Sequence, residues 1–379
     1  MLKKSEILFN KIENKTIVWF ENSNQYTVLE NTTAKILEDL TKSSPIKKIA
    51  EKLSEEISIP IDKAFDFVLD IEKELYKTSL NKKENIVNDY RDFEKPDSYQ
   101  FSKKYLINDI VLKVDFQSEE ELFLVHPKFA HLETENTLKE NFHYQVFMQN
   151  NFTFLLVDKK LIGSWSQKEI HFFQGKFSMQ IVQNIHQKEE EKWLGVFHAS
   201  AVSDDKSSML FLGDSGNGKS TSLALLQANG FTCLADDFVP VDAAKQEVYS
   251  FPSAISIKKN SLKTLLPLYP ELENSAEFHF KRLHKIVRYL PPNNTNYKKH
   301  LPCKALIFIK YESESDLVLN KISKLNAFEK LVPDSWLSPI KENASIFLNW
   351  FSRIPCYEII YSDNTKMIEA VTKLFADDL

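Results

Sequence analysis

The sequence predicts a mixed α/β protein, in which an α/β domain is preceded by a β-rich part and by a small α+β domain. Three observations support this division. Strand-like and helix-like runs alternate over residues 209–379, which is typical of α/β domains. Short apolar runs separated by polar turns fill residues 99–203. Two strand-like runs followed by three amphipathic segments fill residues 1–80.

The first 80 residues are expected to begin with a β-hairpin, because the apolar runs 17–20 and 26–29 flank polar turn residues. Three helices should follow, since apolar residues recur there at i, i+3, i+4 and i+7, and Pro45 suits a helix start. These segments are 33–40, 46–53 and 61–75. A hairpin followed by three helices is similar to a winged helix, although the helices carry too little positive charge to indicate DNA binding.

The remaining elements follow from the same patterns. Residues 81–98 are charged and poor in apolar side chains, so we expect a linker there. In the β-rich part, the predicted strands include 110–112, 122–125, 152–157 and 170–173. In the α/β part, the predicted strands are 209–212, 231–234 and 304–310, and the predicted helices begin at Lys219 and cover 367–375. The expected domains are therefore 1–80 and 99–379, the latter divided into a β-rich part (99–203) and an α/β part (204–379).

The composition excludes several classes of protein. A chain of 379 residues suits two or three domains, and 43% of apolar residues suffices for packed cores. The 48 basic and 53 acidic residues give a net charge of −5, which argues against nucleic acid or an anionic membrane as the main partner. No apolar run is long enough to span a bilayer, and the polar N-terminus lacks a secretory signal. Three cysteines far apart, without CxxC spacing, indicate a reducing cytoplasm.

Glycine is rare in this chain but concentrated at one place. At an average usage of roughly 7%, a chain of this length would hold about 25 glycines, whereas this one has 7. Three of them, Gly213, Gly216 and Gly218, lie within six positions, in a segment that matches G-x-x-x-x-G-K-[ST]. A strand-like run precedes this segment and a helix-like run follows it. The context predicts a phosphate-binding loop.

Such a loop suits a nucleoside triphosphate with Mg²⁺. Glycines let the loop curl so that its N–H groups point at phosphate oxygens, and the following helix N-terminus adds partial positive charge. Lys219 is expected to pair with the β- and γ-phosphates, and the Ser220 hydroxyl to ligate Mg²⁺. The residues expected to bind the nucleotide are Gly213, Asp214, Ser215, Gly216, Asn217, Gly218, Lys219, Ser220 and Thr221.

Two adjacent aspartates, Asp236 and Asp237, follow the predicted strand 231–234. A right-handed crossover would lay this strand beside the one that precedes the loop, so the carboxylates should reach the metal. One would bind metal and the other would accept the proton of an attacking hydroxyl, because like charges and a metal separate their pKa values. We favour Asp236 as the base and Asp237 as the metal ligand. His198 is a candidate to orient or protonate an aspartate, with a buried core histidine as the alternative.

At these residues a family resemblance becomes visible. The segments FHASAV (197–202), FLGDSGNGKST (211–221) and LADD (234–237) resemble the catalytic domain of HPr kinase/phosphorylase and related P-loop kinases, whose fold is allied to phosphoenolpyruvate carboxykinase. The resemblance covers roughly 99–379, with specific motifs in 198–237. It implies that His198, Asp236 and Asp237 assist proton transfer between a protein serine and ATP, while the loop holds ATP and Mg²⁺. It also points to a homo-oligomer.

Two departures from that family matter. True HPr kinases have an acidic residue directly after GKS, whereas Thr221 and Ser222 follow here, and the glycine-rich segment of the bifunctional enzymes is missing after the acid pair. Both departures argue against HPr as the substrate and against the reverse phosphorylase activity. Further cations are candidates for binding phosphate or substrate, with an ordinary solvated face as the alternative. They are Lys258, Lys259, Lys281, Arg282, Lys285 and Arg288.

The N-terminal part has a resemblance of its own. The segments VWFENSNQYTVLENTTAKILEDL (18–40) and SPIKKIAEKLSEE (44–56) are similar to PqqD-type peptide-recognition domains. The resemblance implies that residues 1–80 bind the leader of a ribosomally synthesised precursor peptide as an added strand at a sheet edge. The alternative is an ordinary winged-helix interaction module.

Together these expectations describe a cytoplasmic kinase that has a capture domain for its substrate. It would transfer the γ-phosphoryl group of ATP, or of GTP, to a Ser or Thr hydroxyl of the captured precursor peptide. Two alternatives remain: a serine kinase of an HPr-like carrier protein with 1–80 as a docking module, and a nucleotide-binding regulator without transferase activity. Neither nucleic acid nor a membrane is expected as a partner.

Overall fold

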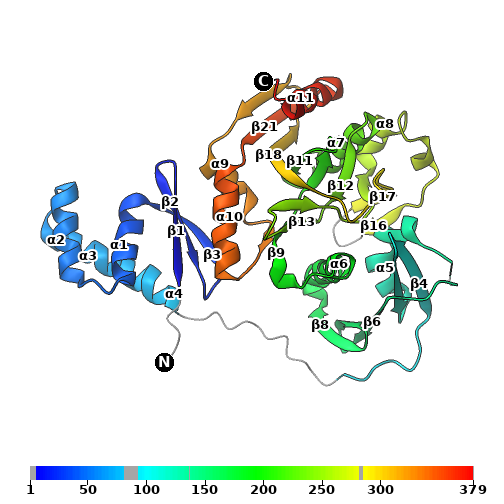
Figure 1. The fold of residues 1–379 in the computed structure, drawn as a ribbon, viewed down its shortest axis with the longest axis horizontal. Coiled ribbons are helices and arrows are strands. Elements are labelled where there is room, and N and C mark those ends of the chain that lie inside the picture. The colour runs from blue at the N-terminus through cyan, green and yellow to red at the C-terminus, as the bar shows by residue number, and fades with distance from the viewer. Residues whose placement is uncertain (1–5, 81–92, 136, 281–284, 379) are drawn as a thin grey trace. The chain divides into compact units, whose positions relative to one another are not determined.

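The computed structural model describes residues 6–80, 93–135, 137–280 and 285–378. The chain is a mixed α/β protein with several sheets (Figure 1), which confirms the predicted class at that level. It divides into two compact units, which are described separately. The N-terminal unit comprises 1–86 together with 323–353, and the large unit comprises 87–322 together with 354–379. Among the described helices, none combines the length and the apolar composition that crossing a bilayer would require.

The N-terminal unit contains a three-stranded antiparallel sheet in the order β1-β2-β3. The strands are β1 (Ile7–Ile12), β2 (Lys15–Phe20) and β3 (Gln25–Glu30). The helices are α1 (Asn31–Thr41), α2 (Ile46–Ile57) and α3 (Ile61–Ile71), followed by a π-helical turn (Glu72–Lys77) and α4 (Thr78–Leu80). The predicted hairpin and three helices are confirmed as elements, and β1 is an additional strand.

Local sequence explains where these helices start and what they bury. Pro45 and Pro60 occupy the N-cap positions of α2 and α3, where a missing N–H costs nothing. Helix α2 ends at Ser58, whose left-handed backbone (φ 54°) stops it. The buried apolar side chains of the three helices join those of the sheet in one core, which includes Leu37 and Val68.

Residues 323–353 belong to the N-terminal unit, which differs from the predicted domain at 99–379. They form α9 (Lys324–Leu331), β20 (Ser335–Leu337) and α10 (Lys341–Arg353). The ring of Tyr26 on β3 lies 6.1 Å from that of Phe328 and 5.4 Å from that of Phe347. The Asn24 side-chain amide donates to the Leu337 carbonyl at 2.8 Å. Phe328 and Phe347 thus pack against β3. Of the predicted linker, 81–92 lies outside the described residues.

The first part of the large unit is a five-stranded sheet in the order β4-β5-β6-β7-β8. Its strands are β4 (Phe101–Ile107), β5 (Ile110–Phe116), β6 (Phe142–Gln149), β7 (Phe152–Val157) and β8 (Lys160–Ser166). Neighbouring strands are antiparallel except β5 and β6, which are parallel. Two helices also belong here, α5 (Glu119–Phe129) and α6 (Ile170–His186).

Two predicted strands in this part are wrong, because residues 122–125 lie in α5 and 170–173 lie in α6. A capping box starts each of these helical segments. The Ser118 hydroxyl accepts from the Glu120 N–H, and the Glu121 carboxylate accepts from the Ser118 N–H. Ser166 and Glu169 form the same motif ahead of α6. In a run of only four residues these caps outweigh a strand-like composition.

The main sheet of the large unit has the order β12-β10-β11-β18-β14-β13-β9, and β21 lies beside β18 with β19 beside it. Its strands are β9 (Trp193–Phe197), β10 (Ser200–Ser203), β11 (Ser208–Leu212), β12 (Thr232–Asp236), β13 (Val239–Asp242), β14 (Glu247–Tyr249), β18 (His300–Tyr311), β19 (Val318–Lys321) and β21 (Cys356–Tyr361). The helices α7 (Lys219–Ala228) and α11 (Asn364–Ala376) pack on it.

The predicted contact between β11 and β12 is wrong, because β10 lies between them and is antiparallel to both. Strands β11 and β12 consequently run in the same direction, and their carboxyl ends still reach the same sheet edge. Strand β18 is parallel to β11 on the other side, and β21 is parallel to β18. A smaller sheet follows in the order β15-β17-β16. It consists of β15 (Ile255–Lys258), β17 (Lys285–Leu290) and β16 (Phe278–Phe280), with α8 (Leu262–Leu265) nearby in sequence.

Candidate functional site

The glycine-rich loop joins β11 to α7, as the sequence predicts. Gly213, Gly216 and Gly218 have φ values of 145°, 107° and 94°, which glycine adopts without strain. A Cβ at Gly213 would lie 2.7 Å from the backbone oxygen of Ile309, closer than such atoms approach. The loop conformation therefore requires glycine at these positions. The curl brings successive backbone N–H groups and the start of α7 to one place, as phosphate binding demands.

The loop is held from within and from the neighbouring strand. The Asn217 N–H donates to the Asp214 carbonyl at 3.1 Å, and the Asn217 carbonyl accepts from the Tyr311 N–H at 3.1 Å. The Lys219 ammonium donates to the carbonyls of Gly213 and Asp214. Lys219 thus lies along the loop, with its charge beside the backbone groups that a phosphate chain would meet.

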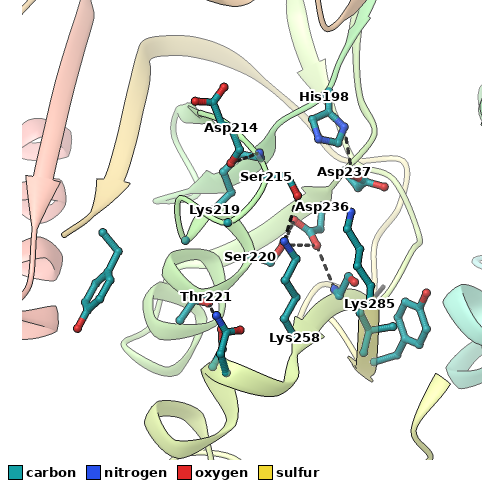
Figure 2. Close-up of a pocket in the computed structure, with 18 of the residues that line it drawn as sticks. His198, Asp214, Ser215, Lys219, Ser220, Thr221, Asp236, Asp237, Lys258 and Lys285 are labelled. Carbon is teal, nitrogen blue, oxygen red and sulfur yellow. Dashed lines mark hydrogen bonds and ion pairs between the residues drawn. The ribbon is translucent and has the colours of Figure 1, made fainter. Parts of the chain in front are cut away.

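Asp236, the last residue of β12, is buried under the loop, with 2% of its surface exposed. Its carboxylate accepts hydrogen bonds from the Ser220 hydroxyl at 2.9 Å, the Ser200 hydroxyl at 2.6 Å and the Ser256 N–H at 3.0 Å. Burial, and the neighbouring charge of Asp237, raise the pKa of Asp236 above its ordinary value, although these hydrogen bonds oppose the shift. Figure 2 shows the contact between Ser220 and Asp236.

Asp237 lies in a different environment one residue later. Its backbone is left-handed (φ 69°), which turns its side chain away from the strand, and 46% of that side chain is exposed. One carboxylate oxygen lies 3.1 Å from the His198 Nδ1, and the other lies 3.1 Å from the Lys128 ammonium. Burial alone would raise the pKa of Asp237, but the positive charges of Lys128, His198 and Lys219 outweigh it and lower the pKa to about 2.

These groups line one cavity of about 350 Å³. Ten of the sequence-predicted site residues are among its walls: His198, Asp214, Ser215, Gly216, Gly218, Lys219, Ser220, Thr221, Asp236 and Asp237. Gly213 and Asn217 are not among the residues that line it. They shape the loop from behind, through the close approach to Ile309 and the hydrogen bond from Tyr311.

Of the further cations named from the sequence, Lys258 and Lys285 line the cavity (Figure 2). Lys258 donates to the Ser215 hydroxyl at 3.1 Å. Burial, with the nearby charges of Lys285 and Lys219, lowers the pKa of Lys258. Arg288 instead has a local structural role, donating to the carbonyl of Leu272 and to the Glu277 carboxylate. Lys259 is not among the lining residues, and Lys281 and Arg282 lie outside the described residues.

Sequence reasoning missed several residues of the cavity wall. They are Lys128, Gln174, Tyr289, Tyr311, Tyr361 and Asn364, among others. Lys128 comes from α5, more than a hundred residues before the acid pair, and no local motif surrounds it. The two tyrosines at 311 and 361 end β18 and β21, and they reach this edge because β18 is parallel to β11 and β21 is parallel to β18.

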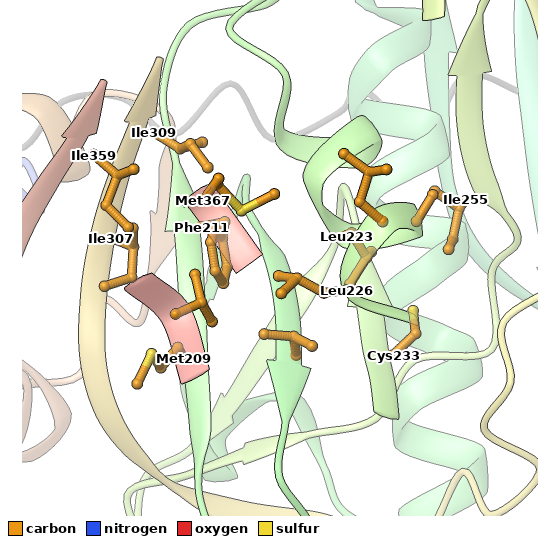
Figure 3. Packing of buried hydrophobic residues seen from close by; sticks show 14 of the residues in the cluster. Met209, Phe211, Leu223, Leu226, Cys233, Ile255, Ile307, Ile309, Ile359 and Met367 are labelled. Atoms are coloured by element: carbon orange, nitrogen blue, oxygen red, sulfur yellow. The ribbon is translucent and has the colours of Figure 1, made fainter. Parts of the chain in front are cut away.

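A hydrophobic core beneath the loop holds β11 and α7 in place (Figure 3). Phe211 of β11, Leu223 of α7 and Met367 of α11 belong to it and are fully buried. Ile307 and Ile359 continue it across β18 and β21. Because the strand before the loop and the helix after it share one packed core, both ends of the loop are held in place.

The residues present fit a Mg²⁺ ion that is shared with a nucleotide. Within the described ranges, no group of three or more His, Cys, Asp or Glu side chains is arranged to hold a metal by itself. Mg²⁺ needs no such group when substrate phosphates and water complete its shell around one or two carboxylates. The Ser220 hydroxyl and the Asp236 carboxylate, which are in contact, provide such a partial shell.

The chain matches no protein-family model and no curated protein. The geometry of the cavity and the sequence motifs are thus what indicate a function for this chain.

Proposed function

We propose that this protein is an ATP-dependent kinase that phosphorylates a Ser or Thr hydroxyl of a captured precursor peptide. The observation that supports this best is the meeting of the glycine-rich loop with the acid pair in one cavity, through the 2.9 Å contact between Ser220 and Asp236. A loop that binds phosphates, a buried carboxylate and an exposed carboxylate are the parts that phosphoryl transfer requires. GTP is an alternative donor.

In this proposal the loop and Lys219 hold the β- and γ-phosphates, and the cavity fixes the acceptor in line with the γ-phosphorus. The acceptor oxygen bonds to the γ-phosphorus as the bond from that phosphorus to the β–γ bridging oxygen breaks. The hydroxyl proton passes to a carboxylate of the site, and the nucleoside diphosphate leaves. Mg²⁺, when bound, would neutralise charge on the phosphate oxygens.

From the sequence we favoured Asp236 as the base and Asp237 as the metal ligand. The contacts favour the reverse assignment. Asp236 is buried and touches Ser220, so we propose Asp236 as the carboxylate on the metal side. Asp237 is exposed to the cavity and oriented by His198 and Lys128, so we propose that it accepts the hydroxyl proton. A carboxylate with a pKa near 2 is a weak base. Its main contribution is then to orient the hydroxyl and to take the proton late, as a loose transition state allows.

The peptide-capture role is proposed for the N-terminal unit. In the described residues β3 is an edge strand of its sheet, and a cavity of about 670 Å³ lies beside it. The cavity is lined by β3 and by Phe328, Val332 and Leu337, among others. An extended leader could add to β3 through main-chain hydrogen bonds while its side chains enter this cavity. Tethered capture raises the effective substrate concentration towards the millimolar range.

Transfer of label from [γ-³²P]ATP tests the kinase proposal. The full chain is incubated with Mg²⁺ and with short peptides encoded beside its gene, or with candidate carrier proteins. Peptide labelling is expected, and Lys219→Ala should abolish it because the phosphates lose their cation. Lys263→Ala, at an exposed lysine of α8 that does not line the cavity, is the matched control.

The other outcomes of this assay are equally informative. Label on a carrier protein alone would point to the carrier-kinase alternative. Nucleotide binding without transfer to either acceptor would point to a regulator. Full labelling by Lys219→Ala would contradict the role of the loop.

A further inference from the structure

We propose that the ring of Tyr311 is the platform on which the nucleobase stacks. This inference rests on the proposed function, since it requires a nucleotide on the glycine-rich loop. It adds a specific residue for the base, which the loop motif and the acid pair leave unassigned.

The sheet topology indicates on which side of the loop the nucleoside lies. The acid pair ends β12, which is separated from β11 by β10, on one side of the loop. Strands β18 and β21 lie on the opposite side of β11 and run parallel to it, so their carboxyl ends reach the same edge. Tyr311 and Tyr361 are paired as the last residues of these two strands. The loop therefore lies between carboxylates and tyrosines.

A triphosphate in this loop has two ends, and each side of the loop suits one of them. The γ-phosphate must lie towards Asp237, where the acceptor is activated. The nucleoside is then directed to the other side, where β18 and β21 end. Ligands of open α/β sheets bind at the carboxyl ends of strands, which is the edge that all these residues share.

Tyr311 has the position and the exposure of a stacking residue. Its ring lines the same cavity as the loop, and the residue is 49% exposed. Its N–H is bonded to the Asn217 carbonyl, and a Cβ on Gly218 would lie 3.6 Å from the Tyr311 Cβ. These contacts hold the Tyr311 backbone and Cβ next to the glycine-rich loop, so its ring starts beside the phosphate site.

The second tyrosine supports the first. Tyr361 is buried, and its hydroxyl is 2.8 Å from the Ser222 hydroxyl on α7. The two rings lie 5.5 Å apart at 81°, an edge-to-face contact that covers at most one face of Tyr311. In this proposal the base stacks on the face that Tyr361 does not cover. Stacking on one aromatic face accepts any base, so Tyr311 is expected to bind adenine and guanine alike.

The test compares ligands with and without a base. Calorimetric titration of the full chain, with Mg²⁺ present, measures the Kd for ATP, GTP and inorganic tripolyphosphate. Tyr311→Ala should raise the Kd for ATP and GTP by similar factors, roughly 5- to 150-fold, the loss that one base–aromatic stack produces. The Kd for tripolyphosphate should not change, because the loop is intact. Tyr311→Phe should bind ATP like the wild type.

Phe172→Ala, which removes a 59% exposed ring of α6 that does not line the cavity, is the control and should change none of these constants. An unchanged Kd for ATP in Tyr311→Ala overturns the inference. So does an equal loss for ATP and tripolyphosphate, because Tyr311 would then act on the loop alone. Failure of the proposed function looks different: the wild type itself binds no ligand, or Lys219→Ala binds as well as the wild type.

Discussion

At the scale of single residues, the neighbouring aspartates show how a step of one residue along the chain places two identical side chains in different environments. Asp236 ends a strand and is enclosed by hydroxyl groups, so burial raises its pKa. Asp237 has a left-handed backbone and faces Lys128 and His198, so its pKa is low despite partial burial. The difference arises from the backbone turn between them, because both side chains have the same intrinsic acidity.

Lys128→Met tests this assignment through the pH dependence of the reaction. Without the Lys128 ammonium the pKa of Asp237 should rise, because burial is then opposed by fewer positive charges. Below that pKa the carboxylate is protonated and cannot accept the hydroxyl proton, so the acidic limb of kcat/KM should move to higher pH. Activity at about pH 8 should be affected less than activity at about pH 5. The measurement is the pH–rate profile of peptide labelling.

Lys128→Arg keeps the charge and should keep the wild-type profile. An acidic limb that stays in place in Lys128→Met would show that Asp237 is not the proton acceptor, because Lys128 contacts that carboxylate directly.

At the scale of elements, the direction of the strands brings the residues of the site together. The loop after β11, the acid pair at the end of β12 and the tyrosines that end β18 and β21 all lie at the same edge, because these four strands run in the same direction. Strand β10 lies between β11 and β12 and is antiparallel to both, so it separates the acid pair from the loop while leaving both at the same sheet edge. The loop itself then needs glycine where it passes the end of β18.

Gly213→Ala should damage the loop. Its Cβ would lie 2.7 Å from the Ile309 backbone oxygen, and its φ of 145° is strained for alanine. We expect a loss of about 1–3 kcal/mol in the free energy of unfolding. The affinity for ATP should fall as well, because the phosphate-binding N–H groups move. Urea denaturation and ATP titration measure the two effects.

Gly175→Ala is a matched control in helix α6, where the structure describes no atom within 4 Å of an added Cβ. It should raise the free energy of unfolding by about 0.5–1 kcal/mol, as expected for alanine replacing glycine inside a helix. Equal effects of the two substitutions would contradict the role assigned to the loop geometry.

At the scale of the whole molecule, residues 323–353 link two parts of the sequence that we expected to fold separately. Their aromatic side chains pack on Tyr26 of β3, so a truncation of residues 1–80 would expose Phe328 and Phe347. Loss of activity on such a truncation would then report misfolding as readily as lost capture. A point substitution in the cavity beside β3 is the cleaner test of peptide capture.

Val332→Arg is that substitution, because it places a long charged side chain in the cavity lined by β3. The KM for a full-length precursor peptide should rise at least about tenfold, since the tethering advantage is lost. The KM for a peptide without its leader should not change.

Ile57→Arg, at an exposed position of α2 away from that cavity, is the control. A KM for the full-length peptide that stays at the wild-type value in Val332→Arg would rule out capture at this cavity.

The sequence alone determined the features that depend on local chemistry. The glycine spacing at 213–218, the apolar strand before it and the helix after it are all present as predicted, as are the N-terminal hairpin and three helices. Short-range periodicity and backbone requirements specify such features within a few residues.

The tertiary structure decided what depends on contacts between distant segments. It placed Lys128 of α5 on Asp237, inserted β10 between β11 and β12, and brought 323–353 to β3. Residues 170–186 are likewise helical, which the short run 170–173 was not long enough to indicate. Packing partners that are distant in the sequence determine these features. The periodicity of apolar residues within one segment shows which face is buried, but not which distant segment covers that face.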